Sequence, residues 1–198
     1  MVDVNPINPT GSHRGNAQPC CAARASRYAL FMVLAMMGCA ADLTTKSSMF
    51  GWLGEPQSGR IYWLIEGYVG FETALNEGAL FGFGQKMIWL FVTMSFVALG
   101  GIGYWLIHKR AIDDHRLTVT LGIVTGGILG NLYDRLGFWS DFTIFAVRDW
   151  IRLSYDYHRY VWPNFNIADS LLVCGAGLLV WHSLRVPAPT GTQYPSKV

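Results

Sequence analysis

Long apolar runs alternate with short polar segments along most of this chain. Residues 87–107 and 117–133 hold no charged side chain, and residues 164–184 hold a single acid, Asp169. A membrane-spanning helix needs about 20 predominantly apolar residues. The run from Tyr28 to Ala41 reaches that length only if the helix extends over residues 26–46, with Lys46 snorkelling to the interface. The pattern therefore predicts four membrane-spanning helices.

The remaining segments differ from one another in composition. Residues 1–25 and 186–198 are polar and contain most of the prolines, which predicts disordered tails on either side of a domain at 26–185. Residues 50–84 combine aromatic and β-branched side chains with glycine, which predicts a small β-rich element. Residues 136–163 are aromatic and of mixed charge, and are expected to form a folded outer loop along the membrane surface. The predicted fold class is an all-α polytopic membrane protein with a small extramembrane β-element.

Composition supports a membrane protein and excludes several other classes. Hydrophobic residues make up 52% of the chain, charged residues only 14%, and there are eight tryptophans. The net charge of +2 gives no reason to expect a nucleic-acid partner. The five His form no HExxH pattern and the four Cys form no CxxC pair, so we expect no metal, no cofactor and no disulfide framework.

Basic residues suggest an orientation for the helices. The segment between the second and third predicted helices, HKRAIDDHR, carries Lys109, Arg110 and Arg116. Short cytoplasmic loops carry an excess of Lys and Arg. This loop and both termini are therefore expected to be cytoplasmic.

Polar residues gather at the opposite, outer end of the predicted bundle. They are Asp42, Thr45 and Lys46 at the end of the first helix, Asn131, Asp134 and Arg135 at the end of the third, and Asn166 and Asp169 at the start of the fourth. Members of each group are spaced so that they share one helix face. A carboxylate at the centre of a membrane helix costs roughly 2.5–3.5 kcal/mol. Anchoring or helix bridging explains any one group, but three groups on one side predict a functional site.

The available chemistry at this site is that of acids. No GxSxG motif and no His or Cys ligand set occurs there, whereas Asp134, Asp141, Asp149 and Asp156 are all candidates to meet Asp169. Two neighbouring carboxylates cannot both ionise easily, so one retains a proton and the pair can activate a water. This predicts an aspartic peptidase. An ion relay in a small transporter, or a surface protein lipidated on Cys39, are the alternatives from other classes.

Five motifs resemble those of the lipoprotein signal peptidase, or signal peptidase II, family. They are DLTTK at 42–46, NEGALF at 76–81, GGILGNLYDR at 126–135, VRDW at 147–150 and FNIAD at 165–169. The resemblance implies a four-helix aspartic endopeptidase of the bacterial inner membrane with a small β-cradle. It further implies that diacylglyceryl-modified prolipoproteins are cut immediately before the modified cysteine, without a cofactor. Membrane lipid would surround the protein, which is expected to act as a monomer.

The resemblance assigns the two catalytic acids. The family's dyad maps to Asp149 and Asp169, with Asn166 hydrogen-bonding near the dyad. Asp134 would be a structural acid that the neighbouring Arg135 holds ionised. Asp149 is preferred to Asp141 because of its flanking residues, although residues 136–148 are longer than usual in the family.

Other residues would support the site. Arg135 and Asn131 would position the substrate backbone or lipid carbonyls, Asn76 would act from the cradle, and Asp42 and Lys46 would brace the cradle against the helices. The full supporting set is Asp42, Lys46, Asn76, Gly78, Asn131, Asp134, Arg135, Asn166 and Ala168. Trp150, where Phe is usual, and Leu80, where Ala or Trp is usual, depart from the family pattern.

Overall fold

A computed structural model describes residues 21–78, 87–155 and 159–185 of the chain. The predictions made for residues 1–20, for residues 186–198, for Leu80 and for Asp156 lie outside this described part. The main helices are α1 (Cys21–Leu53), α2 (Ile88–His108), α3 (His115–Arg135) and α4 (Ile167–Arg185). The strands are β1 (Ile61–Ile65), β2 (Val69–Asn76), β3 (Val147–Tyr155) and β4 (Tyr160–Phe165).

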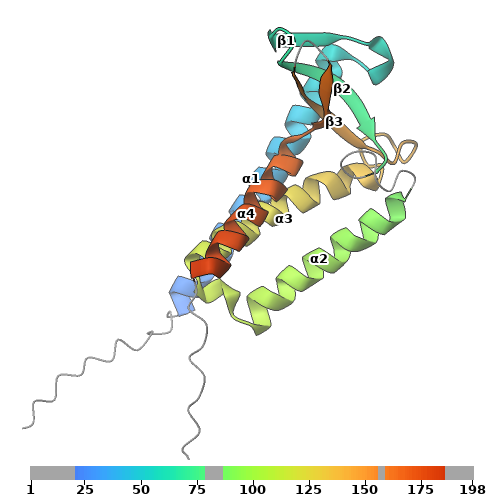
Figure 1. Ribbon diagram of the computed structural model, residues 1–198. Coiled ribbons are helices and arrows are strands. Elements are labelled where there is room, and N and C mark those ends of the chain that lie inside the picture. The colour runs from blue at the N-terminus through green and yellow to red at the C-terminus, as the bar shows by residue number, and fades with distance from the viewer. Residues whose placement is uncertain (1–20, 79–86, 156–158, 186–198) are drawn as a thin grey trace, which may run out of the picture.

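The helices form a bundle with the sheet at one end. α3 packs against α1, α2 and α4, while α2 stands somewhat apart from α1 and α4 (Figure 1). The start of α1 and the end of α4 lie together at the end of the bundle opposite the sheet (Figure 1). Residues 21–25, expected in the N-terminal tail, instead form the first turn of α1, because this alanine-rich stretch favours a helix.

α3 packs closely on α1 through three glycines spaced four residues apart, Gly122, Gly126 and Gly130. A Cβ on Gly126 would lie 2.9 Å from the carbonyl oxygen of Ala35 and 3.1 Å from the Cα of Gly38. A Cβ on Gly130 would overlap the carboxylate of Asp42. Small residues at such spacing let helix backbones approach in lipid, where close packing rather than the hydrophobic effect drives helix association.

We expect Gly126→Ala to destabilise the protein by about 1–3 kcal/mol, because the added methyl group meets backbone atoms that cannot move aside cheaply. The matched control is Gly101→Ala on α2, where nothing lies within 4 Å of the new Cβ. That change should be neutral or stabilising by up to about 1 kcal/mol, since alanine favours a helix over glycine. Thermal unfolding in detergent measures both. Equal melting temperatures for the two variants would contradict the close approach of α1 and α3.

Within the described residues, α1, α2 and α4 are long and apolar enough to cross a membrane. The fourth predicted span, α3, does not meet that measure. Its polar residues Thr118, Thr120, Thr125 and Asn131 are buried against the other helices. A helix at the centre of a bundle faces protein rather than lipid, so it can carry more polar groups than a lipid-facing one.

The β-structure is larger than the sequence indicated. The four strands form one antiparallel sheet in the order β1-β2-β3-β4. Residues 136–163, expected to be a loop, contain β3 and most of β4. That expectation was wrong, because β3 becomes a strand by pairing with β2, with Asp149 opposite Ala74 and Val147 opposite Asn76. The expected start of the β-element near residue 50 is also corrected.

The β-element begins late because α1 continues to Leu53. Gly54 follows with a φ of +85° and donates its N–H to the carbonyl of Phe50. Glycine adopts this left-handed conformation without steric cost, so it is the residue that commonly ends a helix. The extra helical turns carry α1 past the other helix ends and up beside the sheet (Figure 1).

Candidate active site

The sheet holds Asp149 in place. This residue lies on β3 and is only 1% exposed. Its Oδ1 accepts a hydrogen bond from Asn166 Nδ2 at 2.6 Å, and its Oδ2 accepts one from Asn76 Nδ2 at 3.1 Å. Both donors are neutral amides, one from the end of β2 and one from the start of α4. The carboxyl group is therefore fixed by side chains from two different parts of the fold.

The start of α4 holds Asp169. The backbone N–H of Asn166 donates to Asp169 Oδ2 at 3.2 Å, and the N–H of Asp169 donates to Asn166 Oδ1 at 2.9 Å. This reciprocal pair is the arrangement of a helix capping box. A second amide, Asn131 Nδ2 on α3, donates to Asp169 Oδ1 at 2.8 Å. The three-residue spacing noted in the sequence is thus a helix cap that also fixes an acid.

Asn166 connects the two acids. Its side-chain amide, which is fully buried, donates to Asp149 and also to Asn131 Oδ1 at 3.2 Å, while Asn131 donates to Asp169. The sequence prediction that places Asn166 beside the acid pair agrees with this geometry. Asn131 was expected to face the substrate; in the structure it is 3% exposed and its amide is already bonded to Asp169.

Burial governs the ionisation of Asp149. Burial first, and the nearby charge of Asp169 second, raise the pKa of Asp149 to about 8. The amides of Asn76 and Asn166 act in the opposite direction, because they stabilise the ionised form. Near neutral pH the Asp149 carboxyl therefore carries a proton. Two adjacent acids that share one proton are the arrangement used in general acid–base catalysis with water.

A second group of buried charges lies directly beside the acid pair. Lys46 Nζ lies 2.6 Å from Asp42 Oδ2 and 3.2 Å from Asp134 Oδ2, and it donates to Asn131 Oδ1 at 3.0 Å. Asp134 also accepts the guanidinium of Arg148 at 2.8 Å. These four charged residues, Asp42, Lys46, Asp134 and Arg148, are at most 4% exposed. We call them the buried charge cluster; two acids and two cations make it neutral overall.

Two predictions about this cluster need correction. Asp134 pairs with Lys46 and Arg148 and not, as expected, with Arg135, because adjacent residues on a helix point in different directions. Asp42 and Lys46 join helices rather than bracing the sheet directly: Asp42 accepts the backbone N–H of Ala168 on α4 at 2.9 Å. The link to the sheet is Arg148, which the sequence reasoning missed. Its own N–H donates to Asp134 Oδ2 at 2.9 Å.

Arg135 contacts the end of β2 instead. Its guanidinium donates to the carbonyl of Gly78 at 3.3 Å and lies 5.1 Å from the centre of the Phe91 ring. The N–H of Gly78 in turn donates to Asn76 Oδ1 at 3.0 Å. Arg135 thus holds the turn that presents Asn76 to Asp149.

The other candidate acids do not share this environment. Asp141 is exposed, in the turn that follows α3, with a φ of +49°. Asp134 is engaged by two cations. The acid that shares Asn166 with Asp169 is Asp149. In residues 21–78, 87–155 and 159–185, no three His, Cys, Asp or Glu side chains cluster as metal ligands would.

An apolar cavity opens beside Asp169. Its volume is about 330 Å³ and it lies between β3, β4 and the start of α4. The lining residues are Leu153, Trp162, Phe165, Asp169, Ser170, Val173 and Cys174. Asp169, which is partly exposed, is the ionisable acid in this lining. A ligand with an apolar chain could therefore reach one acid of the pair from this side.

Comparisons with known proteins agree with this site. The family described as Signal peptidase (SPase) II matches residues 34–185. A lipoprotein signal peptidase of Rhodopirellula baltica is 46% identical over 185 residues, which cover 91% of this chain and 82% of that protein. One from Rhodococcus jostii is 33% identical over 191 residues, covering 96% and 88%.

A solved bacterial membrane enzyme shares the fold, with a TM-score of 0.67 at 21% identity, over 91% of this chain and 97% of that one. Together with the three apolar helices, this likeness supports a multi-pass membrane protein. The match to the family over most of the chain decides the identity. The chain belongs to the signal peptidase II family, the aspartic peptidases that remove signal peptides from prolipoproteins.

Proposed function

We propose that Asp149 and Asp169 are the catalytic pair of this peptidase and that they cut immediately before the diacylglyceryl-modified cysteine of the prolipoprotein. The observation that carries the proposal is the position of Asn166, which donates hydrogen bonds to both acids. Asn166 is a neutral amide, so these bonds hold the acids without pairing them with a cation. The buried charge cluster lies next to the pair but has its own internal balance of charge. The acids are therefore left to share one proton.

The raised pKa of Asp149 supports one division of roles between the two acids. Asp149 holds the proton and donates it towards the carbonyl oxygen of the scissile peptide. Asp169 takes a proton from a water molecule, whose oxygen forms the new bond to the carbonyl carbon. When the tetrahedral intermediate collapses, the C–N bond breaks and the leaving amine takes the proton held by Asp169. Asp149 recovers its proton from the hydroxyl of the intermediate, which restores the starting state.

The surroundings of Asp169 support a lipid-anchored substrate. The cavity beside this acid is lined mainly by apolar and aromatic side chains. A diacylglyceryl group and a membrane-embedded signal peptide both reach the site from lipid, so an apolar approach lowers the cost of bringing the peptide bond to the acids. The membrane lipids surround a monomer that carries every member of the site on one chain.

The arrangement of the helices supports a single orientation. All four helices cross the bacterial inner membrane, with α3 shielded by the other three. The segment with Lys109, Arg110 and Arg116 lies at the opposite end of the bundle from the acid pair and faces the cytoplasm. Both termini are on that side, and the acid pair and sheet are near the outer face, where water can enter.

We expect kcat/KM for precursor cleavage to fall about tenfold per pH unit above about pH 8. Rising pH removes the proton from Asp149, which can then no longer protonate the carbonyl oxygen. The measurement is initial cleavage rate against pH with a diacylglyceryl-modified precursor in detergent. A rate that stays constant to pH 10 would contradict the assignment of the proton to Asp149.

Asn76→Ala tests the direction in which the pH profile shifts. The Asn76 amide lowers the pKa of Asp149 by stabilising its carboxylate, so its removal should move the fall in rate to higher pH. Asn164→Ala removes an amide of the same sheet that bonds to Glu72 and not to the acid pair. That variant should show the wild-type pH profile.

A further inference from the structure

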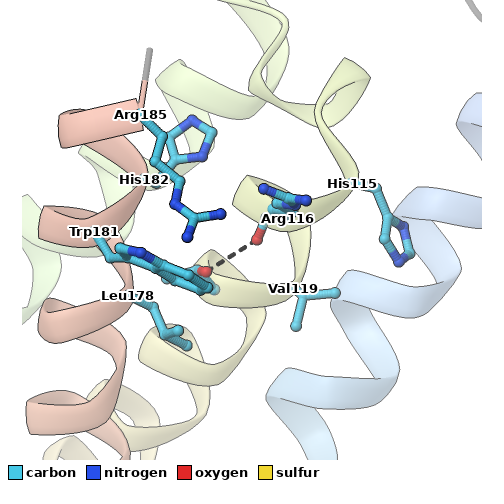
Figure 2. A pocket seen from close by; sticks show the side chains of 8 residues that line it. His115, Arg116, Val119, Leu178, Trp181, His182 and Arg185 are labelled. Atoms are coloured by element: carbon cyan, nitrogen blue, oxygen red, sulfur yellow. Dashed lines mark hydrogen bonds between the residues drawn. The ribbon is translucent and has the colours of Figure 1, made fainter.

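A second cavity lies at the end of the bundle opposite the acid pair. It has a volume of about 300 Å³ and is formed by the first turns of α3 and the last turns of α4 (Figure 2). The lining residues are His115, Arg116, Val119, Thr120, Leu178, Trp181, His182 and Arg185. The catalytic mechanism uses none of them.

The cavity lining changes from apolar to cationic towards the ends of the two helices. Val119 and Leu178 lie further into the bundle, whereas Arg116 and Arg185 lie at the helix ends. Arg185 lies over the Trp181 ring, with its guanidinium carbon 4.1 Å from the ring centre. Figure 2 shows the Arg116 and Arg185 side chains on the two sides of the cavity, one from each helix. An apolar floor below a cationic rim matches the order of groups in a phospholipid.

The two arginines differ from their basic neighbours at this end of the bundle. Arg24 donates to both carboxylate oxygens of Asp113 at 2.8 Å, and Arg27 donates to the carbonyl of Ile112 at 3.2 Å. Within the described part of the chain, neither Arg116 nor Arg185 lies within 4.0 Å of a carboxylate oxygen. No acid among the described residues therefore pairs with either of these two charges.

Asp114, an acid at the same end of the bundle, bonds to other groups. Asp114 Oδ1 caps α3 by accepting the N–H groups of Arg116 at 2.8 Å and Leu117 at 3.1 Å. Its other oxygen lies 3.4 Å from His182 Nε2. The Asp114 carboxylate thus contacts the start of α3 and His182. The two guanidinium groups of Arg116 and Arg185 lie at the rim of the cavity.

We infer that this cavity binds an anionic phospholipid, with the headgroup phosphate between Arg116 and Arg185 and an acyl chain against Val119 and Leu178. Guanidinium groups bind phosphate oxygens strongly through paired N–H donors. Basic pockets between membrane helices are suited to anionic headgroups. The apolar floor favours a lipid over free phosphate. The inference requires only that α3 and α4 end at a membrane surface, and it does not depend on which acids are catalytic.

The test uses the full chain in nanodiscs or detergent, with phosphatidylglycerol as the probe and phosphatidylcholine as the zwitterionic comparison. Native mass spectrometry counts lipids retained by wild type, Arg116→Gln and Arg185→Gln. Each substitution should weaken phosphatidylglycerol binding about fivefold and leave phosphatidylcholine unchanged. The matched control is Lys109→Gln, which removes one charge from the same end of the protein but not from the cavity; it should retain wild-type binding. Thermal melting checks that each variant is folded.

Two further arms separate a lipid from a free anion. Val119→Phe fills the apolar floor without changing charge, so it should weaken phosphatidylglycerol binding, and millimolar inorganic phosphate should not displace the lipid. An equal loss of binding in Lys109→Gln would overturn the inference in favour of diffuse surface charge. Displacement by inorganic phosphate, or unchanged binding in both arginine variants, would also overturn it.

Discussion

Asp149→Asn and Asp169→Asn should each reduce cleavage of a diacylglyceryl-modified precursor by at least about 10³-fold. Each change preserves the size of the side chain but, on the proposed mechanism, removes either the proton donor or the proton acceptor for water attack. The effects of residues that act as a unit are not additive, so the double variant should lose about as much activity as either single variant. A gel-shift assay with purified proteins, run side by side, measures the loss.

Asp141→Asn is the control for this pair, because Asp141 is exposed in the turn after α3. It should retain most of the wild-type rate. An inactive Asp141→Asn beside an active Asp149→Asn would show that the wrong acid is paired with Asp169. An unlipidated precursor completes the assay: cleavage equal to that of the lipidated one would contradict the proposed approach from lipid.

Asp134→Asn should destabilise the protein by about 3–5 kcal/mol, the largest stability effect that we expect from one substitution. Asp134 is fully buried and contacts both cations of the buried charge cluster. Removing its charge leaves Lys46 with Asp42 alone and leaves Arg148 buried without a carboxylate. Thermal unfolding in detergent measures the change.

The control for Asp134→Asn restores the balance of charge. Arg148→Gln added to Asp134→Asn removes the cation that has lost its partner, so the double variant should be more stable than the sum of the two single changes predicts. Asp141→Asn, at an exposed position, should change stability by less than about 0.5 kcal/mol. Additive losses in the double variant would show that the two residues do not stabilise each other.

The helices could be predicted from the sequence because their apolar composition is a local property. Each of the four expected segments is helical, with boundaries shifted by a few residues, except that α1 begins earlier and continues to Leu53. The β3 and β4 strands could not be predicted in the same way. β3 is defined by pairing with β2, which lies more than 70 residues earlier in the chain, and no local pattern records that partner.

The site shows the same division between local and distant information. Asn166 and Asp169 could be paired from their spacing, since both groups belong to one helix start. The partner of Asp134 could not, because it depends on where β3 places Arg148. One signal was available: Arg148 precedes Asp149 directly, and successive strand residues point to opposite faces. Opposite charges on the two faces of the strand indicate that each face has a polar partner.

The amides around the acid pair have a consequence for the path of protons. In the described part of the chain, hydrogen bonds connect Lys46 to Asp169 through Asn131, whose oxygen accepts from Lys46 while its nitrogen donates to the acid. A carboxamide at ordinary pH transmits an electrostatic influence but neither gives up nor gains a proton. The ammonium group of Lys46 can therefore polarise the pair without discharging into it. Among the described residues, Asn131 and Asn166 thus separate the acids from the ammonium group of Lys46, and on the proposed mechanism the acids exchange protons with water and the peptide instead.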